Sequence, residues 1–463
     1  LGPADVLAYA IEYAGGGFPI GGSAVNVISR VAPWFRKHWP SSASLFLDGG
    51  APPVPGSRFV NRELAETYQR IADEAQAASR DREEQIERAR EIFYEGFVAE
   101  SIAKFATREV MDESGREHRG LLGYDDLAGW RASVEDPIAF DYRGHTVYKA
   151  GPWSQAPVFL QQLSLLDGFD LDSMDPAGPE FVHTVVECAK LAFADREAFY
   201  GDPGFTDVPL DDLLSAEYAK QRRSLVSTVA DTGDLRPGSP GGRIPRLPTV
   251  RLVPQSLGDT WVGEPTLGPT KGDTCHLDVA DRFGNVVSAT PSGSWLHGAP
   301  IIPGLGFCLG TRGQMFWLED GLPNTLAPGK RPRTTLTPSL AVRDGEITAF
   351  GTPGGDQQDQ WSLLWFLHRV HHGMDMQSAI DTPAWHTSHF TSSFYPRAAV
   401  PGRMHIEARA GEETVRALRD RGHDVVVEGD WSLGRISATS RSADGFLRAA
   451  ANPRGAQGYA VGR

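Results

Sequence analysis

A threonine at the start of an alternating segment is the feature of this sequence that most directly predicts chemistry. Thr274 opens the run Thr-Cys-His-Leu-Asp-Val-Ala-Asp, directly after Lys-Gly-Asp. If the bond between Asp273 and Thr274 is cut, Thr274 carries a side-chain hydroxyl and a free α-amine. The α-amine has a reference pKa of about 7.7–8.0, so near neutral pH it accepts the proton of the hydroxyl, which alone is a weak nucleophile. One residue then supplies both the nucleophile and the base for acyl transfer.

A simpler interpretation of the same stretch is a turn that leads into an ordinary strand, because Gly and Asp are common turn residues. Apolar Leu277 and Val279 alternate with polar His276 and Asp278, and the chain turns back at residues 281–284. This pattern predicts a β-hairpin that begins beside Thr274. The hairpin alone does not choose between the two interpretations, so the choice depends on other groups in the chain.

Acyl transfer also needs hydrogen-bond donors for the oxyanion, and Gly354 and Gly355 are candidates for this role. They precede a segment with Trp361, Leu364 and Leu367 at helical spacing, which predicts a helix. Backbone N–H groups at a helix start are good anion donors, and glycine allows close approach because it has no Cβ. A plain helix-entry turn would use the same residues, and the sequence leaves both interpretations open.

Five motifs follow one another in the second half of the chain: Lys271-Gly272-Asp273-Thr274, the Ala-Asp-x-x-Gly-Asn hairpin, residues 326–332, Leu336-Thr337-Pro338 and residues 351–355. In this order they resemble the γ-glutamyltransferases (γ-glutamyltranspeptidases), a family of N-terminal-nucleophile hydrolases that cut themselves before the threonine. Segments of the first half, among them residues 92–103, 124–128, 141–144 and 194–196, are similar to the large-subunit half of that family. The resemblance therefore spans nearly the whole chain.

The resemblance implies roles for further residues around Thr274. Gly354 and Gly355 match the oxyanion hole of the family, and Ser292 falls where the family has a second threonine beside the nucleophile. A second group would bind substrate. Thr334 and Thr335 match a serine pair that binds the substrate α-carboxylate, and Gln314 matches a glutamine on a strand that lines the pocket.

Two departures from the family pattern bear on the substrate. Ser294 replaces an asparagine, and Trp317 replaces the acidic residue that pairs with the α-ammonium of a γ-glutamyl group. Trp317 offers a cation–π contact or, as the favoured interpretation, an apolar or stacking wall. The combination resembles the cephalosporin-acylase-like branch of the family. It is also similar to family homologues of antibiotic pathways that hydrolyse a carbon–carbon bond beside a carbonyl.

The chain predicts an α+β fold. Residues 58–78 and 80–105 have the pattern of long charged helices, residues 137–150 that of two short strands, and residues 335–350 that of a second hairpin. Helices in both halves with hairpins favour a layered arrangement, and the resemblance implies a four-layer αββα sandwich of the N-terminal-nucleophile hydrolase type.

A cut before Thr274 would give a large subunit, residues 1–273, and a small subunit, residues 274–463, which together form one αββα unit. The large subunit would end in an exposed linker rich in Pro and Gly, residues 227–273. Such a tail can move aside after cleavage and uncover the site.

Composition excludes several classes of partner. The formal net charge of −14 argues against nucleic acid or an anionic membrane surface as the main partner, and no apolar run approaches the roughly 20 residues of a membrane helix. The sequence shows no convincing metal site. The three cysteines fit neither a disulfide framework nor a zinc pattern. His368, His371 and His372 have a spacing that can hold zinc, but no further ligand is evident, so we predict neither metal nor cofactor. We expect a cytoplasmic protein, although the sequence begins at Leu1 with neither Met nor a signal-peptide pattern.

Together these observations predict an autoprocessed N-terminal-threonine hydrolase that cleaves an amide-type bond of a small, non-standard substrate, with a place in specialised-metabolite or antibiotic biosynthesis. The two fragments should associate as a heterodimer, and a dimer of heterodimers is left open. Three alternatives stand beside this prediction: hydrolysis of a carbon–carbon bond next to a carbonyl, γ-glutamyl hydrolysis or transfer on glutathione-like peptides, and an inactive relative that serves as a binding module.

Overall fold

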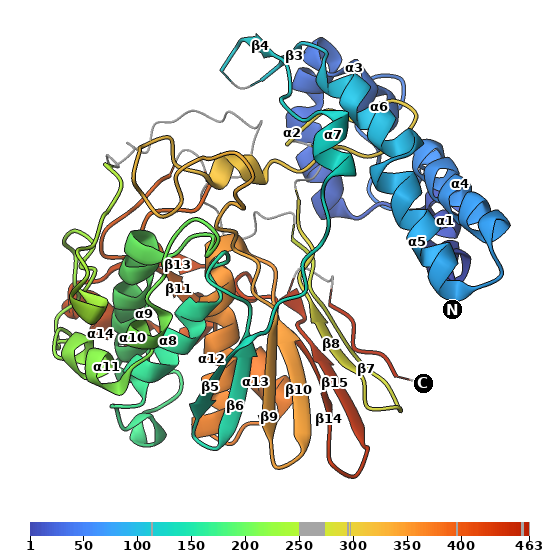
Figure 1. The fold of residues 1–463 in the computed structure, drawn as a ribbon. Coiled ribbons are helices and arrows are strands. Elements are labelled where there is room, and N and C mark those ends of the chain that lie inside the picture. Colours follow the sequence, from blue (N-terminus) through green and yellow to red (C-terminus); the bar gives the residue numbers. More distant parts are fainter. Residues whose placement is uncertain are drawn as a thin grey trace. The chain divides into compact units, whose positions relative to one another are not determined.

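The computed structural model describes residues 1–112, 114–249, 274–293, 296, 298–394, 397–454 and 458–462 (Figure 1). Asp273 and Ser294, which carry two of the predicted roles, lie outside the described residues. The chain divides into two compact units. Among the described residues, unit 1 consists of residues 1–134, 293, 296 and 298–311, and unit 2 of the remainder. Within the described ranges, none of the helices is both long and apolar enough to cross a membrane.

Unit 1 is mainly helical. Its helices are α1 (Pro3–Gly16), α2 (Gly22–His38), α3 (Pro40–Phe46), α4 (Arg62–Ala78), α5 (Arg82–Tyr94), α6 (Phe97–Ala106) and α7 (Tyr124–Ala128), and its short strands are β1 (Phe18–Pro19), β2 (Arg58–Phe59), β3 (Val110–Met111) and β4 (Glu117–His118). The helix predicted over residues 80–105 is wrong in one respect, because it is broken into α5 and α6 at Gly96. A Cβ at Gly96 would lie 2.8 Å from the carbonyl oxygen of Ile92, so this break accepts only glycine.

A six-stranded antiparallel sheet forms the centre of unit 2. Its strands, in spatial order, are β15 (Leu447–Ala451), β14 (Ser437–Arg441), β10 (Glu346–Gly351), β9 (Ser339–Arg343), β6 (His145–Lys149) and β5 (Ile138–Tyr142). The predicted hairpins around residues 143–144 and 344–345 are therefore confirmed. Strand β6 pairs with β9, and this pairing joins the first half of the chain to the second.

The two faces of this sheet have different neighbours. Phe350 of β10 packs on Phe159 of α8 (Pro157–Leu166) and on Trp365 of α12 (Gln358–His371). The next residue, Gly351, points to the opposite face because side-chain directions alternate along a strand. A Cβ there would overlap the His276 ring, at the start of the hairpin β7 (Leu277–Ala280) and β8 (Val286–Ala289). Helices therefore cover one face of the sheet, and the hairpin lies on the other.

The hairpin turns its polar side toward the sheet. The His276 and Asp278 side chains are only 1% and 2% exposed, whereas Leu277 and Val279 are 46% and 53% exposed. His276 is hydrogen-bonded through Nδ1 to Thr290 Oγ1 (2.8 Å) and through Nε2 to Asp278 (3.0 Å). Asp278 also accepts a hydrogen bond from Ser437 Oγ of β14 (3.1 Å). Polar contacts thus fix the strand that follows Thr274 on the central sheet.

Further elements of unit 2 are the helices α9 (Pro179–Phe199), α10 (Leu210–Leu213), α11 (Ala216–Arg223), α13 (Met376–Asp381) and α14 (Glu412–Asp420), and a small sheet of β11 (Trp385–Thr387), β12 (Arg403–Glu407) and β13 (Asp424–Glu428).

The predicted linker is described only as far as residue 249. This part is irregular, as predicted, but it is fixed to the unit: the Gly238 N–H donates to Asp195 Oδ1 (2.7 Å), and the Ala230 N–H donates to the Arg421 carbonyl (2.7 Å). Most of residues 227–249 are exposed, so the described part of the predicted linker is an irregular, largely exposed segment that hydrogen bonds attach to the unit at a few points.

The α+β class is confirmed. Unit 2 shows helices, the six-stranded sheet and the β7–β8 pair in succession, which corresponds to the first three layers of an αββα arrangement. The boundary between Asp273 and Thr274 remains a prediction, and it does not coincide with the boundary between the compact units, because residues from both sides of it build unit 2.

Candidate active site

Thr274 and Ser292 meet beside the hairpin. Their hydroxyl oxygens, Oγ1 and Oγ, lie 2.9 Å apart, so one donates a hydrogen bond to the other. Both side chains are half-buried. The Cys275 N–H donates to the Pro291 carbonyl (3.0 Å), which holds the segment of Thr274, before β7, next to the segment of Ser292, after β8. The structure therefore brings together the predicted nucleophile and the hydroxyl that the resemblance places beside it.

Arg312 extends this pair toward the predicted oxyanion hole. Its Nη2 donates to Ser292 Oγ, and its Cζ lies 5.5 Å from the centre of the Phe394 ring. A Cβ at Gly355 would lie 2.9 Å from Cε2 of the same ring. A continuous series of contacts thus leads from Thr274 through Ser292, Arg312 and Phe394 to Gly355.

Gly354 and Gly355 have backbone conformations that favour glycine. Their φ angles are +133° and +57°, and a Cβ at Gly354 would overlap the Trp361 ring. They begin a 3₁₀ turn, Gly355–Gln357, that leads into α12. The N-cap of α12 is Gln357, and the Asp356 carboxylate binds other groups.

A buried ion pair holds the residue that follows Gly354 and Gly355. Arg196 Nη1 of α9 lies 2.5 Å from Asp356 Oδ1, and Asp356 also accepts hydrogen bonds from the Ser393 N–H (2.8 Å) and Oγ (2.6 Å). Burial acts to raise the pKa of Asp356, but the charge of Arg196 and the Ser393 hydrogen bonds outweigh it, and the pKa lies below its ordinary value. Asp356 is therefore ionised at neutral pH and holds the turn in place.

Gln155 connects the glycine turn to the predicted substrate-binding threonines. Its Nε2 donates to the Gly355 carbonyl (3.4 Å), and its N–H donates to the Thr334 carbonyl (2.8 Å). Arg196 donates in turn to Gln155 Oε1 (3.0 Å). Thr335 is 1% exposed, whereas Thr334 is half-buried, and its Oγ1 accepts a weak hydrogen bond from the Leu336 N–H (3.4 Å). Of the two hydroxyls, that of Thr334 is the more accessible.

Trp317 is held between charged residues of the protein itself. Its Nε1 donates to Glu197 Oε1 (3.0 Å), and the Arg397 guanidinium lies 4.3 Å from its ring centre. Burial acts to raise the pKa of Glu197, but Arg333, 2.8 Å away, and Arg196 lower it overall. The Glu197 carboxylate is therefore bound by the protein's own cations, and the indole of Trp317 is held by Glu197 and Arg397.

The expectation that Gln314 lies on a strand is wrong. Gln314 lies in a 3₁₀ helix, Arg312–Met315, and its carbonyl accepts a hydrogen bond from Arg397 Nη2 (2.7 Å). Arg397 Nη1 also donates to the Ser393 carbonyl, so the same cation connects Gln314 to the residue that binds Asp356.

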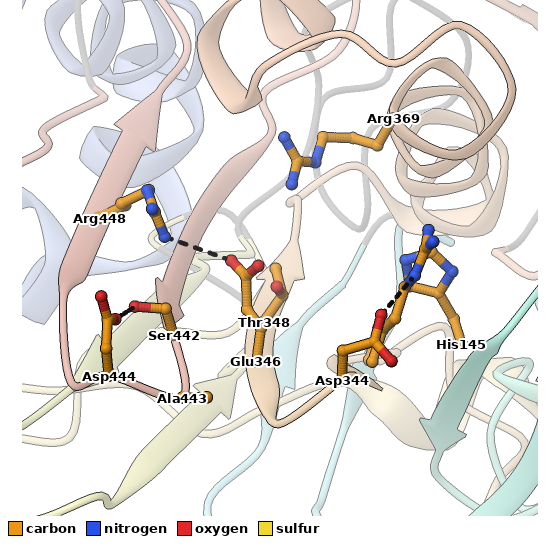
Figure 2. Close-up of a pocket in the computed structure, with 11 residues that line it drawn as sticks. His145, Asp344, Glu346, Thr348, Arg369, Ser442, Ala443, Asp444 and Arg448 are labelled. Carbon is orange, nitrogen blue, oxygen red and sulfur yellow. Dashed lines mark hydrogen bonds and ion pairs between the residues drawn. The ribbon is translucent and has the colours of Figure 1, made fainter.

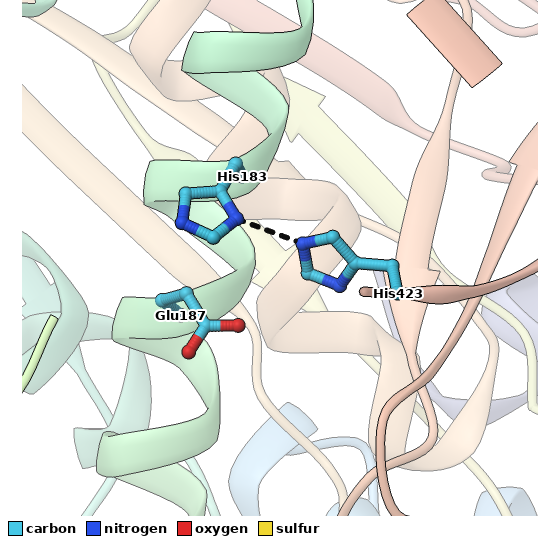
Figure 3. A group of neighbouring side chains, drawn as sticks. All are labelled: His183, Glu187 and His423. Atoms are coloured by element: carbon cyan, nitrogen blue, oxygen red, sulfur yellow. Dashed lines mark hydrogen bonds between the residues drawn. The ribbon is translucent and has the colours of Figure 1, made fainter. Parts of the chain in front are cut away.

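Among the described residues, one group has the ligand types of a metal site. His183 and Glu187 of α9 lie beside His423, with His183 Nδ1 2.8 Å from His423 Nε2 (Figure 3). Lys190 Nζ, however, lies 2.6 Å from Glu187 Oε1, so a cation already neutralises the carboxylate. Burial, and then the charge of Lys190, lower the pKa of His423 to about 3. This positive surrounding opposes a metal ion, and we interpret the three residues as a structural contact.

The histidines of α12 have separate partners. His371 bonds to Asp172 (2.6 Å) and to the Tyr142 hydroxyl (2.7 Å), whereas His368 stacks on Phe181 in the core. Their zinc-like spacing in the sequence is thus explained by packing.

A cavity of about 520 Å³ lies at the turn ends of β9–β10 and β14–β15 (Figure 2). Its lining alternates in charge: Arg448 pairs with Glu346 at 3.7 Å, and Arg343 with Asp344 at 3.2 Å. None of the residues that line it belongs to the predicted site.

Sequence reasoning missed Arg312, Phe394 and Gln155 as parts of this site. The only local signal for Arg312 is a single cation between Gly310 and Gly313, which by itself predicts nothing. Phe394 and Gln155 become visible only through contacts between segments far apart in the chain.

Comparison with known proteins identifies the family of the chain. The family model described as Gamma-glutamyltranspeptidase matches residues 2–462. The chain is 31% identical to the glutathione hydrolase-like YwrD proenzyme of Bacillus subtilis, over 100% of this chain and 77% of that protein. It is 30% identical to the acylase ACY 1 proenzyme of Pseudomonas sp. strain SE83 (97% and 69% covered) and 29% identical to the oxamate amidohydrolase proenzyme of Klebsiella pneumoniae (99% and 76%).

Solved structures show the same similarity. The structure of LmbA2991HD matches with a TM-score of 0.93 and 52% identity, over 100% of this chain and 79% of that chain. The cephalosporin acylase from Bacillus halodurans matches with a TM-score of 0.77 and 26% identity, over 100% and 75%. With a family match along nearly its whole length and the hydroxyl pair in contact, the chain belongs to the gamma-glutamyltranspeptidase family and is a hydrolase of the N-terminal-nucleophile type.

Proposed function

We propose that the chain cuts itself between Asp273 and Thr274 and then hydrolyses an acyl bond of a small molecule through Thr274. The observation that carries this proposal is the 2.9 Å contact between Thr274 Oγ1 and Ser292 Oγ. A hydroxyl that is already hydrogen-bonded has a defined direction and a partner to which its proton can move.

Self-cleavage would follow ordinary acyl chemistry. Thr274 Oγ1 attacks the carbonyl carbon of Asp273, the C–N bond breaks, and the departing nitrogen takes the hydroxyl proton, directly or through Ser292. Water then hydrolyses the resulting ester. The products are a carboxylate at Asp273 and a free α-amine on Thr274, which serves as the base for later turnovers.

Turnover repeats the same steps on the substrate. Thr274 Oγ1 forms a bond to the substrate carbonyl carbon, its proton passes to the α-amine, and the N–H groups at Gly354 and Gly355 stabilise the oxyanion. The proton then moves to the leaving group as its bond to the carbonyl breaks. An amine accepts this proton readily, whereas a carbon leaving group departs only if its negative charge is delocalised. Water finally releases the acyl group and regenerates Thr274.

The surroundings of Trp317 support a substrate without a γ-glutamyl head group. An α-ammonium needs a carboxylate partner, but Glu197 beside Trp317 is bound by Arg333 and by the indole N–H. The names of the acylase and amidohydrolase relatives point the same way, toward non-standard acyl groups. We therefore propose an acyl substrate with an apolar or aromatic part against Trp317, of the kind found in specialised-metabolite biosynthesis.

A denaturing gel with protein mass spectrometry tests the proposal. The purified protein should give two fragments of roughly 30 and 21 kDa, at about 110 Da per residue, and the smaller should begin at Thr274. Thr274→Ala should remain one chain, whereas Thr274→Ser, which keeps a hydroxyl, should still be cut. Incubation with a panel of acyl substrates should leave a covalent adduct on residue 274. An uncut wild-type chain that is nevertheless active would contradict the proposal.

The same panel separates the alternatives. Release of glutamate from a γ-glutamyl anilide at a rate typical of transpeptidases would favour the γ-glutamyl alternative and overturn the argument from Trp317. Analysis of the released group shows whether a nitrogen or a carbon was attached to the acyl carbon.

A further inference from the structure

The cavity of about 520 Å³ has its floor on the helix-covered face of the central sheet. Ala341 of β9 pairs with Thr348 of β10, and Thr348 pairs with Ser440 of β14. Directly paired residues share a face of the sheet, and Thr348 shares its face with Phe350, which packs on the helices. The small side chains of Ala341 and Thr348 therefore leave open space between the sheet and the end of α12.

Arg369, in the last turn of α12, borders this space as a cation without a carboxylate partner. Its Nη1 donates to the Met374 carbonyl (3.0 Å), and among the described residues it forms no ion pair. Burial lowers the pKa of Arg369, although the charges of Glu346 and Asp375 act to raise it. Figure 2 shows the guanidinium pointing from α12 toward Thr348 and Glu346. A partly buried cation in this position gains free energy from an anion that enters the cavity.

The carboxylates that line the cavity have other partners. Glu346 pairs with Arg448 (3.7 Å), and Asp344 pairs with Arg343 (3.2 Å). The Asp344 side chain is also 88% exposed, so water and salt screen its charge. Asp444 is exposed and accepts hydrogen bonds within the β14–β15 turn. Two of the three arginines are thus neutralised by neighbours, whereas the charge of Arg369 remains for a ligand.

Thr348 offers a second hydrogen-bond donor to such a ligand. Its side chain is half-buried, and its hydroxyl forms no hydrogen bond with another described residue. Of the described residues that line the cavity, only Ala341 and Ala443 have apolar side chains, which disfavours an apolar ligand. An oxyanion, in contrast, accepts hydrogen bonds through several oxygens at once, from the planar fork of an arginine and from a hydroxyl. The volume lies within the range of small-molecule sites, about 300–1,000 Å³.

We propose that this cavity is a binding site for a small oxyanion, a phosphate or carboxylate group, held between Arg369 of α12 and Thr348 of β10. The site is separate from Thr274, and the inference does not depend on the proposed function. The turn at Gly354 and Gly355 joins β10 to α12, so a bound anion connects the far ends of these two elements. Because it binds the folded chain, the anion also stabilises the fold.

Titration with inorganic phosphate and with acetate tests the site. Affinity is measured by calorimetric titration, and the midpoint of thermal unfolding is followed in parallel, at an ionic strength held constant with sodium chloride. The proteins compared are the wild type, Arg369→Gln, Arg369→Lys, Thr348→Val and Arg282→Gln. Thr348→Val removes the hydroxyl and keeps the branched shape, and Arg282→Gln removes an equal charge from an exposed turn outside the cavity.

We expect the wild type to bind at least one of the two anions with a Kd of roughly 1 mM or less. Arg369→Gln should weaken this binding roughly 10- to 100-fold, the range for a hydrogen bond to a charged group, and remove the rise in the unfolding midpoint. Arg369→Lys should fall between the two, because an ammonium lacks the planar fork. Thr348→Val should weaken binding roughly 2- to 10-fold, the range for a neutral hydrogen bond. Arg282→Gln should bind like the wild type.

Tighter binding of phosphate would identify a phosphorylated ligand, and tighter binding of acetate a carboxylate. Absence of binding of both anions to the wild type, or equal affinity in the wild type and Arg369→Gln, would overturn the inference. The second result would place the anion elsewhere, for example beside Thr274, which Arg369→Gln leaves intact.

Should Arg369→Gln fail to fold because the Met374 carbonyl loses its donor, Arg369→Lys and Thr348→Val carry the comparison, and unchanged affinity in both counts against the proposal. All preparations are compared in the same state of cleavage, established on a denaturing gel. The result therefore does not depend on whether the chain cuts itself, and failure of this inference is distinct from failure of the proposed function.

Discussion

Two features of Gly355 disfavour a side chain at this position: its left-handed backbone conformation and the nearby Phe394 ring. Mutation of a matched glycine separates their effects. Its φ is +57°, and an added Cβ would lie 2.9 Å from Phe394. Gly373, with φ +62° and open space around its Cβ position, provides a matched control. Gly373→Ala should lower the free energy of unfolding by about 1 kcal/mol, the cost of placing alanine in this conformation.

Gly355→Ala should have the same backbone cost and, in addition, displace the Phe394 ring and the oxyanion donors. We expect kcat to fall roughly 100-fold or more, in the range for loss of one oxyanion donor, while Gly373→Ala retains wild-type kcat. Urea unfolding and steady-state kinetics measure the two effects. An active Gly355→Ala enzyme would exclude this glycine from the oxyanion hole.

Among single residues, the sequence predicted those whose role depends on their own chemistry. Thr274 is a candidate by its type, and the family resemblance is what distinguishes it from an ordinary turn residue and adds Ser292 beside it. Arg312 is not identified, because arginine is common on protein surfaces and its contact with Ser292 joins residues 20 positions apart in the sequence. Ser294 and Asp273 remain predictions, since they lie outside the described residues.

The contact between β10 and the hairpin depends on a position without a side chain. Gly351 has an ordinary backbone conformation, but a Cβ there would overlap the His276 ring, two residues after Thr274. Gly351→Ala should therefore push the hairpin away from the sheet and slow self-cleavage, measured as the uncut fraction on a gel over time. Gly233→Ala, where an added Cβ meets only an ordinary 3.5 Å contact, should be cut like the wild type. Equal cleavage of the two variants would show that the hairpin is not positioned through Gly351.

The start of α12 depends on the buried pair of Asp356 and Arg196, and this dependence predicts a pH effect. Because the pKa of Asp356 is lowered in the folded state, its contribution to stability is complete above its unfolded value, about 3.9, and is lost as pH falls through the folded value. Asp356→Asn should lower the free energy of unfolding by roughly 3–5 kcal/mol at pH 7, because it leaves Arg196 without this partner.

The difference in stability between wild type and Asp356→Asn should shrink as pH falls below about 3.9. Chemical unfolding measured between acid and neutral pH gives this difference directly. A difference that is constant over the whole range would mean that the Asp356 charge does not stabilise the fold.

At the level of elements, short-range patterns gave correct hairpins because turn residues specify them locally. The same patterns could not show that β7 turns His276 and Asp278 inward, since alternation defines two faces but not which one is buried. The break between α5 and α6 was missed because helical spacing continues across Gly96, and only the clash of a Cβ with the Ile92 carbonyl marks it.

The central sheet contains strands from both sides of the proposed cut. Strands β5 and β6 precede Thr274, whereas β9, β10, β14 and β15 follow it, and β6 pairs with β9. The buried Lys149 of β6 also lies 3.1 Å from Asp359 of α12. After cleavage the two fragments should therefore co-elute in size-exclusion chromatography and separate only in denaturant. Independent elution of the fragments under native conditions would contradict the pairing.

For the whole molecule, the sequence supported the α+β class and, through the resemblance, the family. The division into compact units was not foreseen, because it follows contacts between distant segments: residues 298–311 join the helical unit, where Asn61 Nδ2 donates to the Gly306 carbonyl (2.7 Å). Local pattern carries no information about such a long-range contact.

The outward row of the β7–β8 hairpin has a practical consequence. Leu277, Val279 and Val287 are each roughly half exposed, on the side of the hairpin that faces away from the sheet and from the polar contacts of His276. Replacing these three residues by threonine would keep a high strand propensity and reduce the exposed apolar surface. The hairpin thus offers engineers a place to improve colloidal behaviour at high concentration while the reactive threonine stays untouched.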